Sequence, residues 1–83
     1  MNNIKKNEQA RHDFVLGVLA VAQSKGISKS AVKQKCFSSY ATGNRRIEHH
    51  PEELTLVDLF NVATLCGMNP ALFIEKALEN IKN

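Results

Sequence analysis

Residues 54–73 read LTLVDLFNVATLCGMNPALF and contain the start signals of two helices. Thr55, followed three positions later by Asp58, forms the TxxD pattern of a capping box. Asn69, followed by Pro70, places a good N-cap residue before a proline at the first helical position. The stretch therefore predicts two consecutive helices, each with a defined beginning.

Apolar residues in both helices recur at helical spacing. The predicted inner face of the first helix, which ends at Gly67, consists of Leu56, Leu59, Phe60, Ala63 and Cys66. The second helix carries more apolar side chains than the last helix of so small a domain easily buries. We therefore predict that this helix pairs two copies of the chain in a symmetric homodimer, through Leu72, Phe73, Ala77, Leu78 and Ile81. The alternative is that it simply packs onto the first helix of the chain.

Upstream, apolar residues that recur every three or four positions predict an amphipathic helix over residues 8–25. Asn7 is its expected N-cap, and Gly26 is the expected left-handed residue after its end. Gly17 inside this helix either weakens it or permits close approach of another helix. A second helix is predicted from Lys29 to about Cys36, with Ser28 as its N-cap.

Residues 38–50, SSYATGNRRIEHH, raise the question of a further helix. Tyr40, Asn44 and Ile47 have the spacing of one helical face, whereas Gly43 in the middle counts against a helix. No run in the chain has the alternation and β-branched enrichment of a strand. The predicted fold is therefore all-α, a compact bundle of about five short helices.

A chain of 83 residues has room for one compact domain with one small core. We expect this domain to cover residues 7–82 and to follow a flexible N-terminal arm of residues 1–6. The longest apolar stretch, residues 14–22, is too short to span a bilayer, and no signal-peptide pattern is present. Cys36 and Cys66 lack the spacing of a disulfide scaffold or a zinc module. A soluble cytoplasmic protein with reduced, buried thiols is predicted.

The formal net charge is +3, and its distribution is uneven. Residues 1–28 hold four Lys or Arg against two acidic residues, residues 29–50 hold five against one, and residues 51–83 hold two against five. The positive charge is thus concentrated in the middle third of the sequence, which indicates an anionic partner for that segment.

Three stretches of the chain carry a resemblance to a known family. They are GISKSAVKQKC at 26–36, RRIEHHPEELTL at 45–56 and LTLVDLFNVATLCGMNPALF at 54–73. Together they resemble the lambda-repressor-like helix-turn-helix domains of the XRE family, to which many phage, plasmid and bacterial regulators belong. The resemblance covers about residues 11–75. It implies a repressor-like transcription regulator that binds double-stranded DNA and occupies an operator.

The chain departs from the family pattern at three points. Lys33 stands where the family usually has alanine, and Phe37 stands where it usually has a glycine in the turn. The interval from Ile27 to Glu48 is about one residue longer than usual. The turn or the third helix is therefore predicted to be irregular.

In a helix-turn-helix, the second helix of the motif enters the major groove and the flanking segments contact phosphates. Arginine, asparagine and threonine are residue types that recognise base edges. The predicted base contacts are Tyr40, Thr42, Asn44, Arg45 and Arg46. The predicted phosphate contacts, which fix the position of the protein on the duplex, are Ser28, Lys29, Lys33, Lys35 and Ser39.

Other functions find less support in the sequence. Adjacent histidines at positions 49 and 50 lack the i, i+4 spacing of a helical metal pair, so no metal site is predicted. No catalytic triad context, phosphate-binding glycine loop or carboxylate pair is present, so neither enzymatic activity nor a cofactor nor a small-molecule ligand is predicted. The alternative is a small helical protein-binding adaptor or antirepressor that keeps the fold without reading DNA.

Overall fold

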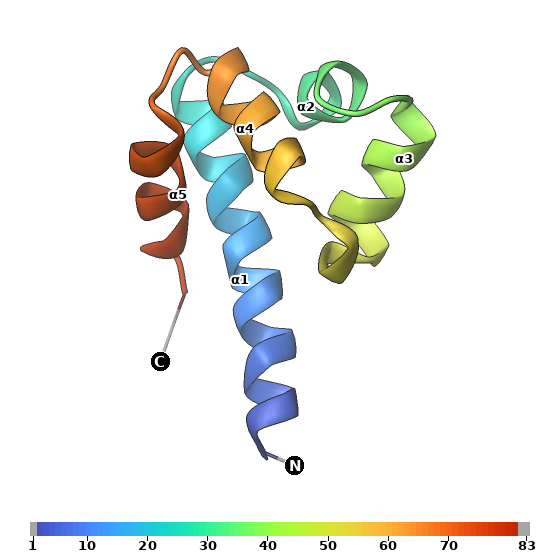
Figure 1. Cartoon of the computed structure of the whole chain (residues 1–83), viewed down its shortest axis with the longest axis vertical. Helices are drawn as coiled ribbons and strands as arrows, with labels where there is room; N and C mark the ends of the chain where they lie inside the picture. Colours follow the sequence, from blue (N-terminus) through green and yellow to red (C-terminus); the bar gives the residue numbers. More distant parts are fainter. Residues whose placement is uncertain (1, 82–83) are drawn as a thin grey trace.

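The computed structural model of the chain describes residues 2–81, with side chains described from Asn7 onward. The described part is helical and contains no strand. Its elements are α1 (Asn2–Ser24), α2 (Lys29–Lys35), α3 (Tyr40–Asn44), the π-helical turn η1 (Arg45–His49), the 3-10 turn η2 (Pro51–Glu53), α4 (Leu56–Leu65) and α5 (Pro70–Leu78). The predicted all-α fold with five short α-helices is confirmed for these residues. In Figure 1, α5 lies alongside α1, and the N-terminal part of α1 extends beyond the rest of the molecule.

The first helix is longer than its sequence pattern predicts. α1 begins at Asn2, so Asn7 lies inside the helix and does not cap it, and part of the predicted N-terminal arm is helical. Gly26, with φ of 79°, takes the left-handed conformation after the helix, as predicted. The backbone N–H of Ile27 donates to the carbonyl oxygen of Ala22 at 2.9 Å, which closes the end of α1 and turns the chain into α2.

The core has two parts, and both pack against α1. The larger cluster joins all the long helices and comprises Val18, Ala22, Val32, Cys36, Val62, Ala63, Phe73 and Ala77. The smaller cluster joins α1 to η1 and comprises Val15, Leu19 and Ile47. Burial of such side chains is the main favourable contribution to folding, at about 25 cal/mol per Å² of apolar surface removed from water. α1 is therefore the element on which both halves of the core are built.

Gly17 marks the closest approach between α1 and α5. A Cβ atom at this position would lie well inside contact distance of the Ala77 carbonyl oxygen and 2.9 Å from Cβ of Asn80. Asn80 also donates from Nδ2 to the carbonyl oxygen of Asp13 at 2.9 Å. Of the two roles expected for Gly17, the structure shows close helix contact.

The start of α4 follows the capping prediction. Thr55 Oγ1 accepts from the backbone N–H of Asp58 at 3.1 Å, and Asp58 Oδ2 accepts from the backbone N–H of Thr55 at 2.9 Å. The predicted inner face is partly wrong, because Leu56 and Phe60 are 60% and 42% exposed. Asp58 turns inward instead, so the buried face of α4 is rotated toward Asp58 and Val62.

The start of α5 also follows its prediction. Asn69 Oδ1 accepts from the backbone N–H of Ala71 at 2.9 Å, and Pro70 occupies the first helical position. Phe73 and Ala77 were predicted at a homodimer interface, but both are fully buried in the core of the chain itself. They bind α5 to α1, because these two residues and Gly17 lie on the facing sides of the two helices.

Both cysteines are free thiols, with Cys36 buried and Cys66 half-buried. Burial raises the pKa of the Cys36 thiol to about 11, so this group is protonated and unreactive at neutral pH.

No single helix among residues 2–81 has both the length and the apolar composition to cross a membrane, and α4 and α5 meet those limits only jointly, across a bend of 102°.

We expect Gly17→Ala to lower the free energy of unfolding by about 1–3 kcal/mol, because the added methyl group overpacks the contact with α5. Helix propensity alone would act in the opposite direction and stabilise α1 by up to about 1 kcal/mol. Urea unfolding followed by circular dichroism measures the difference. Gln23→Ala, at an exposed position of the same helix, is the control and should change stability by less than about 0.5 kcal/mol. Equal or greater stability of Gly17→Ala would contradict the close contact.

Candidate nucleic-acid interface

Two short helices and the bend between them form the candidate interface. Ser28 begins α2, and its Oγ accepts from the backbone N–H of Ala31 at 3.1 Å. Residues 36–39 form the bend, after which Ser39 Oγ accepts from the backbone N–H of Thr42 at 3.1 Å and begins α3. Both serines, predicted as phosphate contacts, are exposed, and their hydroxyl oxygens cap the two helices.

α2 and α3 pack closely at Gly43. A Cβ atom at this position would lie 2.5 Å from the carbonyl oxygen of Lys33 and 2.8 Å from its Cα atom. Any larger residue would force the two backbones apart. The glycine that counted against a helix in the sequence is thus the residue that allows α3 to rest on α2.

Lys33 lies on the inside of this crossing and not on the surface. Its side chain is 7% exposed, and Nζ donates to Asn44 Oδ1 at 2.9 Å and to Glu48 Oε2 at 2.6 Å. A buried ammonium needs such partners, because an unpaired buried charge is strongly destabilising. The prediction that Lys33 contacts phosphate does not fit this position, because the charge is already neutralised inside the fold.

The three polar residues predicted to contact bases on α3 differ in accessibility. Asn44 is half-buried and accepts the hydrogen bond from Lys33. Thr42 is half-buried, and its Oγ1 accepts from the Ser39 hydroxyl at 3.1 Å. Tyr40 is 47% exposed, and its ring centroid lies 5.8 Å from Lys33 Nζ, within cation–π range. Tyr40 therefore presents surface at the start of α3, whereas Asn44 serves the contact between helices.

The carboxylate of Glu48 connects α2 to η1. It accepts from Lys33 and also pairs with Lys29, whose Nζ lies 2.9 Å from Oε2. The hydrogen bond from Lys33 is the main cause, and the one from Lys29 the second, of a Glu48 pKa lowered to about 2. Lys29, another predicted phosphate contact, is exposed but shares this carboxylate.

Arg45 is exposed and makes a two-pronged ion pair. Its Nε donates to Glu53 Oε1 and its Nη2 donates to Glu53 Oε2, both at 2.8 Å. The two side chains are 58% and 37% exposed. An ion pair so open to solvent contributes little to stability, so the guanidinium can exchange its partner.

Arg46 has a different position. Its side chain is 28% exposed, and Nη1 donates at 2.9 Å to Oδ2 of Asp58, which is 8% exposed. The same carboxylate oxygen accepts the capping hydrogen bond from Thr55. Arg46 therefore links η1 to the start of α4, and its predicted base contact would require breaking a largely buried pair.

Three carboxylates within and after the basic segment pair with its cations. Glu48, Glu53 and Asp58 neutralise four of its five cations, namely Lys29, Lys33, Arg45 and Arg46. Residues 29–58 together hold five basic and four acidic side chains, a net charge of +1 against +4 for residues 29–50 alone. Lys35, the remaining predicted phosphate contact, is exposed at the end of α2. The concentration of charge seen in the sequence is largely cancelled in the fold.

Of the two irregularities that the sequence allows, in the turn or in the third helix, the structure shows the second, and its form is a π turn. In η1 the backbone N–H of His50 donates to the carbonyl oxygen of Arg45 at 2.7 Å, a five-residue interval. A π turn accommodates one residue more than an α-helix of the same length. This extra residue directs Ile47 into the core while Arg45 and Glu48 remain outside.

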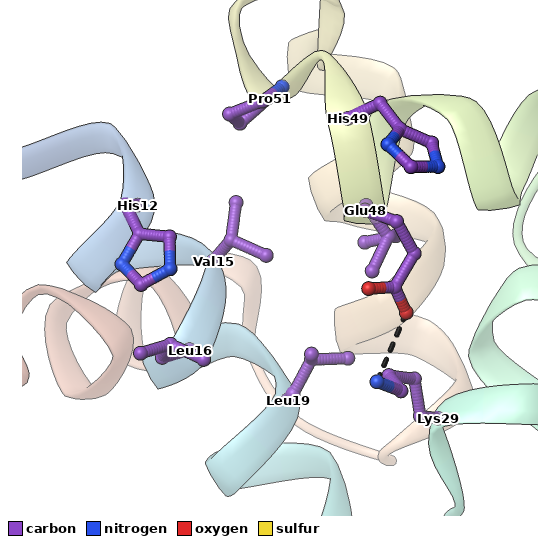
Figure 2. Close-up of a pocket in the computed structure, with 9 residues that line it drawn as sticks. His12, Val15, Leu16, Leu19, Lys29, Glu48, His49 and Pro51 are labelled. Carbon is purple, nitrogen blue, oxygen red and sulfur yellow. Dashed lines mark ion pairs between the residues drawn. The ribbon is translucent and has the colours of Figure 1, made fainter. Parts of the chain in front are cut away.

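A pocket of about 230 Å³ lies between α1 and η1, beside the Lys29–Glu48 ion pair (Figure 2). Its floor is apolar, formed by Val15, Leu19 and Ile47, and its sides include His12 and His49. This volume is below the roughly 300–1,000 Å³ of sites that enclose small-molecule ligands. We assign no ligand to it.

The two adjacent histidines have separate surroundings. His49 borders this pocket, whereas His50 Nδ1 lies 2.9 Å from Glu52 Oε2. One donor atom from each of His50, Glu52 and Glu53 falls within 4.8 Å of the others, a spacing compatible with a metal ion. Glu53, however, already binds Arg45 through both oxygens, and the group is open to solvent. We assign no metal to these residues.

Sequence reasoning missed the acidic partners. Glu48, Glu53 and Asp58 decide which cations are accessible, yet each is distant in sequence from its partners. Glu53 lies 8 positions from Arg45, and Asp58 lies 12 positions from Arg46. Glu48 lies 15 positions from Lys33 and farther still from Lys29. One signal was present: Lys33 stands where the family that the sequence resembles usually has alanine, and a lysine buried at such a position needs a carboxylate. A scan against protein-family models and searches of curated proteins and of solved structures found no match to this chain.

We expect Glu48→Gln to lower the free energy of unfolding at pH 7 by about 1–3 kcal/mol, because Lys33 then remains buried without a carboxylate. Lys33→Met should cost less, because Glu48 keeps Lys29 and partial exposure to water. Urea unfolding of both variants measures the difference. A larger loss of stability in Lys33→Met than in Glu48→Gln would contradict the conclusion that Lys33 is the buried partner and depends on Glu48 for neutralisation.

The same pair predicts a pH dependence of stability. The Glu48 carboxyl ionises near pH 4.5 without its partners and near pH 2 in the fold. Because the folded pKa is lower, the stabilisation is complete above about pH 4.5 and is lost as the pH falls toward 2. We expect wild-type stability to fall across this range more steeply than that of Glu48→Gln. Urea titrations at several pH values give the free energy of unfolding of the two proteins. An equal dependence of this free energy on pH in both proteins would contradict the contribution of Glu48.

Proposed function

We propose that the protein is a sequence-specific DNA-binding transcription regulator that acts in the cytoplasm, without catalytic activity, and that α2 and α3 form a helix-turn-helix of the lambda-repressor-like type. The observation that carries the proposal is the placement of α3. This helix follows a short bend after α2, rests on α2 through Gly43, and keeps Ser39, Tyr40 and Ala41 exposed at its first turn. The first turn of a reading helix is the part that approaches base edges in the major groove.

The contacts of the folded chain divide the predicted site residues into two groups. Arg45, Tyr40 and Thr42 remain candidates for base recognition, and Ser28, Lys29, Lys35 and Ser39 remain candidates for phosphate contact. Lys33, Asn44 and Arg46 instead hold the helices together. Within the proposal, Arg45 is the strongest candidate, because its exposed ion pair with Glu53 can give way to the two directed acceptors of a guanine.

We retain homodimerisation through α5 in the proposal, but with a different set of residues at the interface. Ala71, Ile74, Leu78 and Ile81 recur every three or four positions, lie along one side of the helix and its end, and are exposed or half-buried. Leu72 lies on the other side, next to the charged Glu75 and Lys76. The proposed interface is therefore the stripe that contains Leu78, and two such protomers would address the two halves of a palindromic operator.

A protein-binding adaptor is the second candidate, and two observations favour it. Most cations of the basic segment are neutralised within the chain. Leu56, Val57 and Phe60 are adjacent on α4 and 60%, 66% and 42% exposed, an apolar surface of the kind that partner proteins cover. The two functions are distinguished by DNA selection.

The test of the proposal is selection of duplexes from a random pool by the purified protein, followed by affinity measurements at two salt concentrations. A regulator should enrich a palindrome and bind it about a thousandfold or more tighter than scrambled sequence. Failure to enrich any sequence, with weak binding at low salt, would favour the adaptor.

We expect Arg45→Gln to lower affinity for the selected duplex by roughly 5- to 100-fold, as loss of one base-recognising arginine does, while the free energy of unfolding stays close to that of wild type. Fluorescence anisotropy and urea unfolding measure the two quantities. Arg46→Gln is the matched comparison and should mainly reduce stability, because Asp58 loses a largely buried partner. Unchanged affinity in a folded Arg45→Gln protein would remove Arg45 from the site.

We expect Leu78→Glu to convert a dimer into monomers without unfolding the chain, because Leu78 is 47% exposed and a charge there opposes apolar contact between copies. Sedimentation velocity measures the mass, and circular dichroism verifies the fold. Leu72→Glu, at a similarly exposed position on the other side of α5, is the control and should remain dimeric. The same sedimentation coefficient for Leu78→Glu and wild type would exclude this interface.

A further inference from the structure

Glu53 binds the guanidinium of Arg45 with a hydrogen-bond geometry that a phosphate group can also provide. The two parallel hydrogen bonds, Nε to Oε1 and Nη2 to Oε2, are both 2.8 Å long. Arginine binds the oxygens of a phosphodiester through the same fork of two N–H groups. The carboxylate and a DNA phosphate therefore compete for one guanidinium.

A competing ligand can reach the Arg45–Glu53 ion pair from solvent. Arg45 and Glu53 are 58% and 37% exposed, whereas Arg46, the next residue in η1, and its partner Asp58 on α4 are 28% and 8% exposed. The hydrogen bond from Arg45 lowers the pKa of Glu53, so the carboxylate is charged at neutral pH. Of the two arginines, Arg45 is thus the one held by a partner that solvent and ligands can displace.

We propose that Glu53 masks Arg45 against random-sequence DNA and thereby limits non-specific binding. The inference rests on the proposed DNA-binding function and names the residue that regulates its site. A phosphate alone offers Arg45 little more than Glu53 already does, so Arg45 stays on Glu53 in non-specific complexes. A guanine edge offers two directed acceptors, and the specific complex takes Arg45 from Glu53.

Glu53→Gln removes the competing charge and frees Arg45 to contact any phosphate. Affinity for a random-sequence duplex should rise roughly two- to fivefold at low salt, the equivalent of a weak exposed ion pair. One additional phosphate contact should also steepen the dependence of log K on log salt by about 0.9. For the selected duplex the salt slope should not change, because Arg45 already contacts that DNA in the wild-type protein.

Glu52→Gln is the matched control. It removes the same charge at the neighbouring position, where Glu52 lies beside His50 and does not bind Arg45. General repulsion between acidic residues and DNA would give both variants the same rise in affinity, whereas masking gives it to Glu53→Gln alone. The effect of Glu53→Gln should also vanish in an Arg45→Gln background, since the masked group is then absent.

The experiment measures fluorescence anisotropy of a random-sequence and a selected duplex, with wild type and each variant, over a series of salt concentrations. Masking is supported if only Glu53→Gln shows both a higher affinity for the random-sequence duplex and a steeper dependence of that affinity on salt. If wild type binds DNA and the two glutamine variants behave alike, Glu53 does not mask Arg45. If neither wild type nor any variant binds either duplex at low salt, the proposed DNA-binding function itself is wrong.

Discussion

The ammonium of Lys33, buried where α2 and α3 cross, is the constraint on which the candidate interface depends. It must be neutralised, and Glu48 and Asn44 reach it from beyond the bend. These two contacts fix how far α3 and η1 extend along α2, while Gly43 fixes how closely the helices approach. Because a buried charge without a partner is strongly destabilising, the crossing has one arrangement that satisfies both requirements. The exposed first turn of α3 is a consequence of that arrangement.

The same constraint explains the π turn at η1. Glu48 has to face Lys33 and Lys29 on α2, while the neighbouring Ile47 has to enter the core beside Val15 and Leu19 on α1. The additional residue of a π turn lets the backbone direct adjacent side chains to these two destinations. Arg46 is then placed against Asp58, which fixes η1 to the start of α4. The helices of the candidate interface are thereby joined to the core on both sides.

Folding also changes the electrostatic character of the basic segment. Three carboxylates satisfy four cations, and the pairs are graded from buried, at Lys33, through intermediate, at Arg46, to exposed, at Arg45. The exposed pairs of Arg45 with Glu53 and of Lys29 with Glu48 are weak enough for a ligand to compete with them, and only the first of these pairs contains a guanidinium. The proposed DNA contact and the proposed masking by Glu53 both follow from this gradation, since one guanidinium is at once accessible and occupied. Elsewhere in residues 7–81, no buried side-chain nitrogen or oxygen lacks a hydrogen-bond partner, so the other buried polar groups are committed to the fold.

The sequence by itself determined the helices and most of their ends, because caps and stops depend on residues within one turn of each other. Ser28, Thr55, Asn69 and the left-handed Gly26 perform the roles that their local patterns predict. It did not determine which face of α4 is buried or which cations are free. Those outcomes depend on pairs such as Lys33 with Glu48, 15 residues apart, and on the inward turn of Asp58, which apolar periodicity cannot register. Only the tertiary structure brings these charges together. Two residues form an ion pair because they are close in space, and no fixed spacing in the sequence marks such a pair.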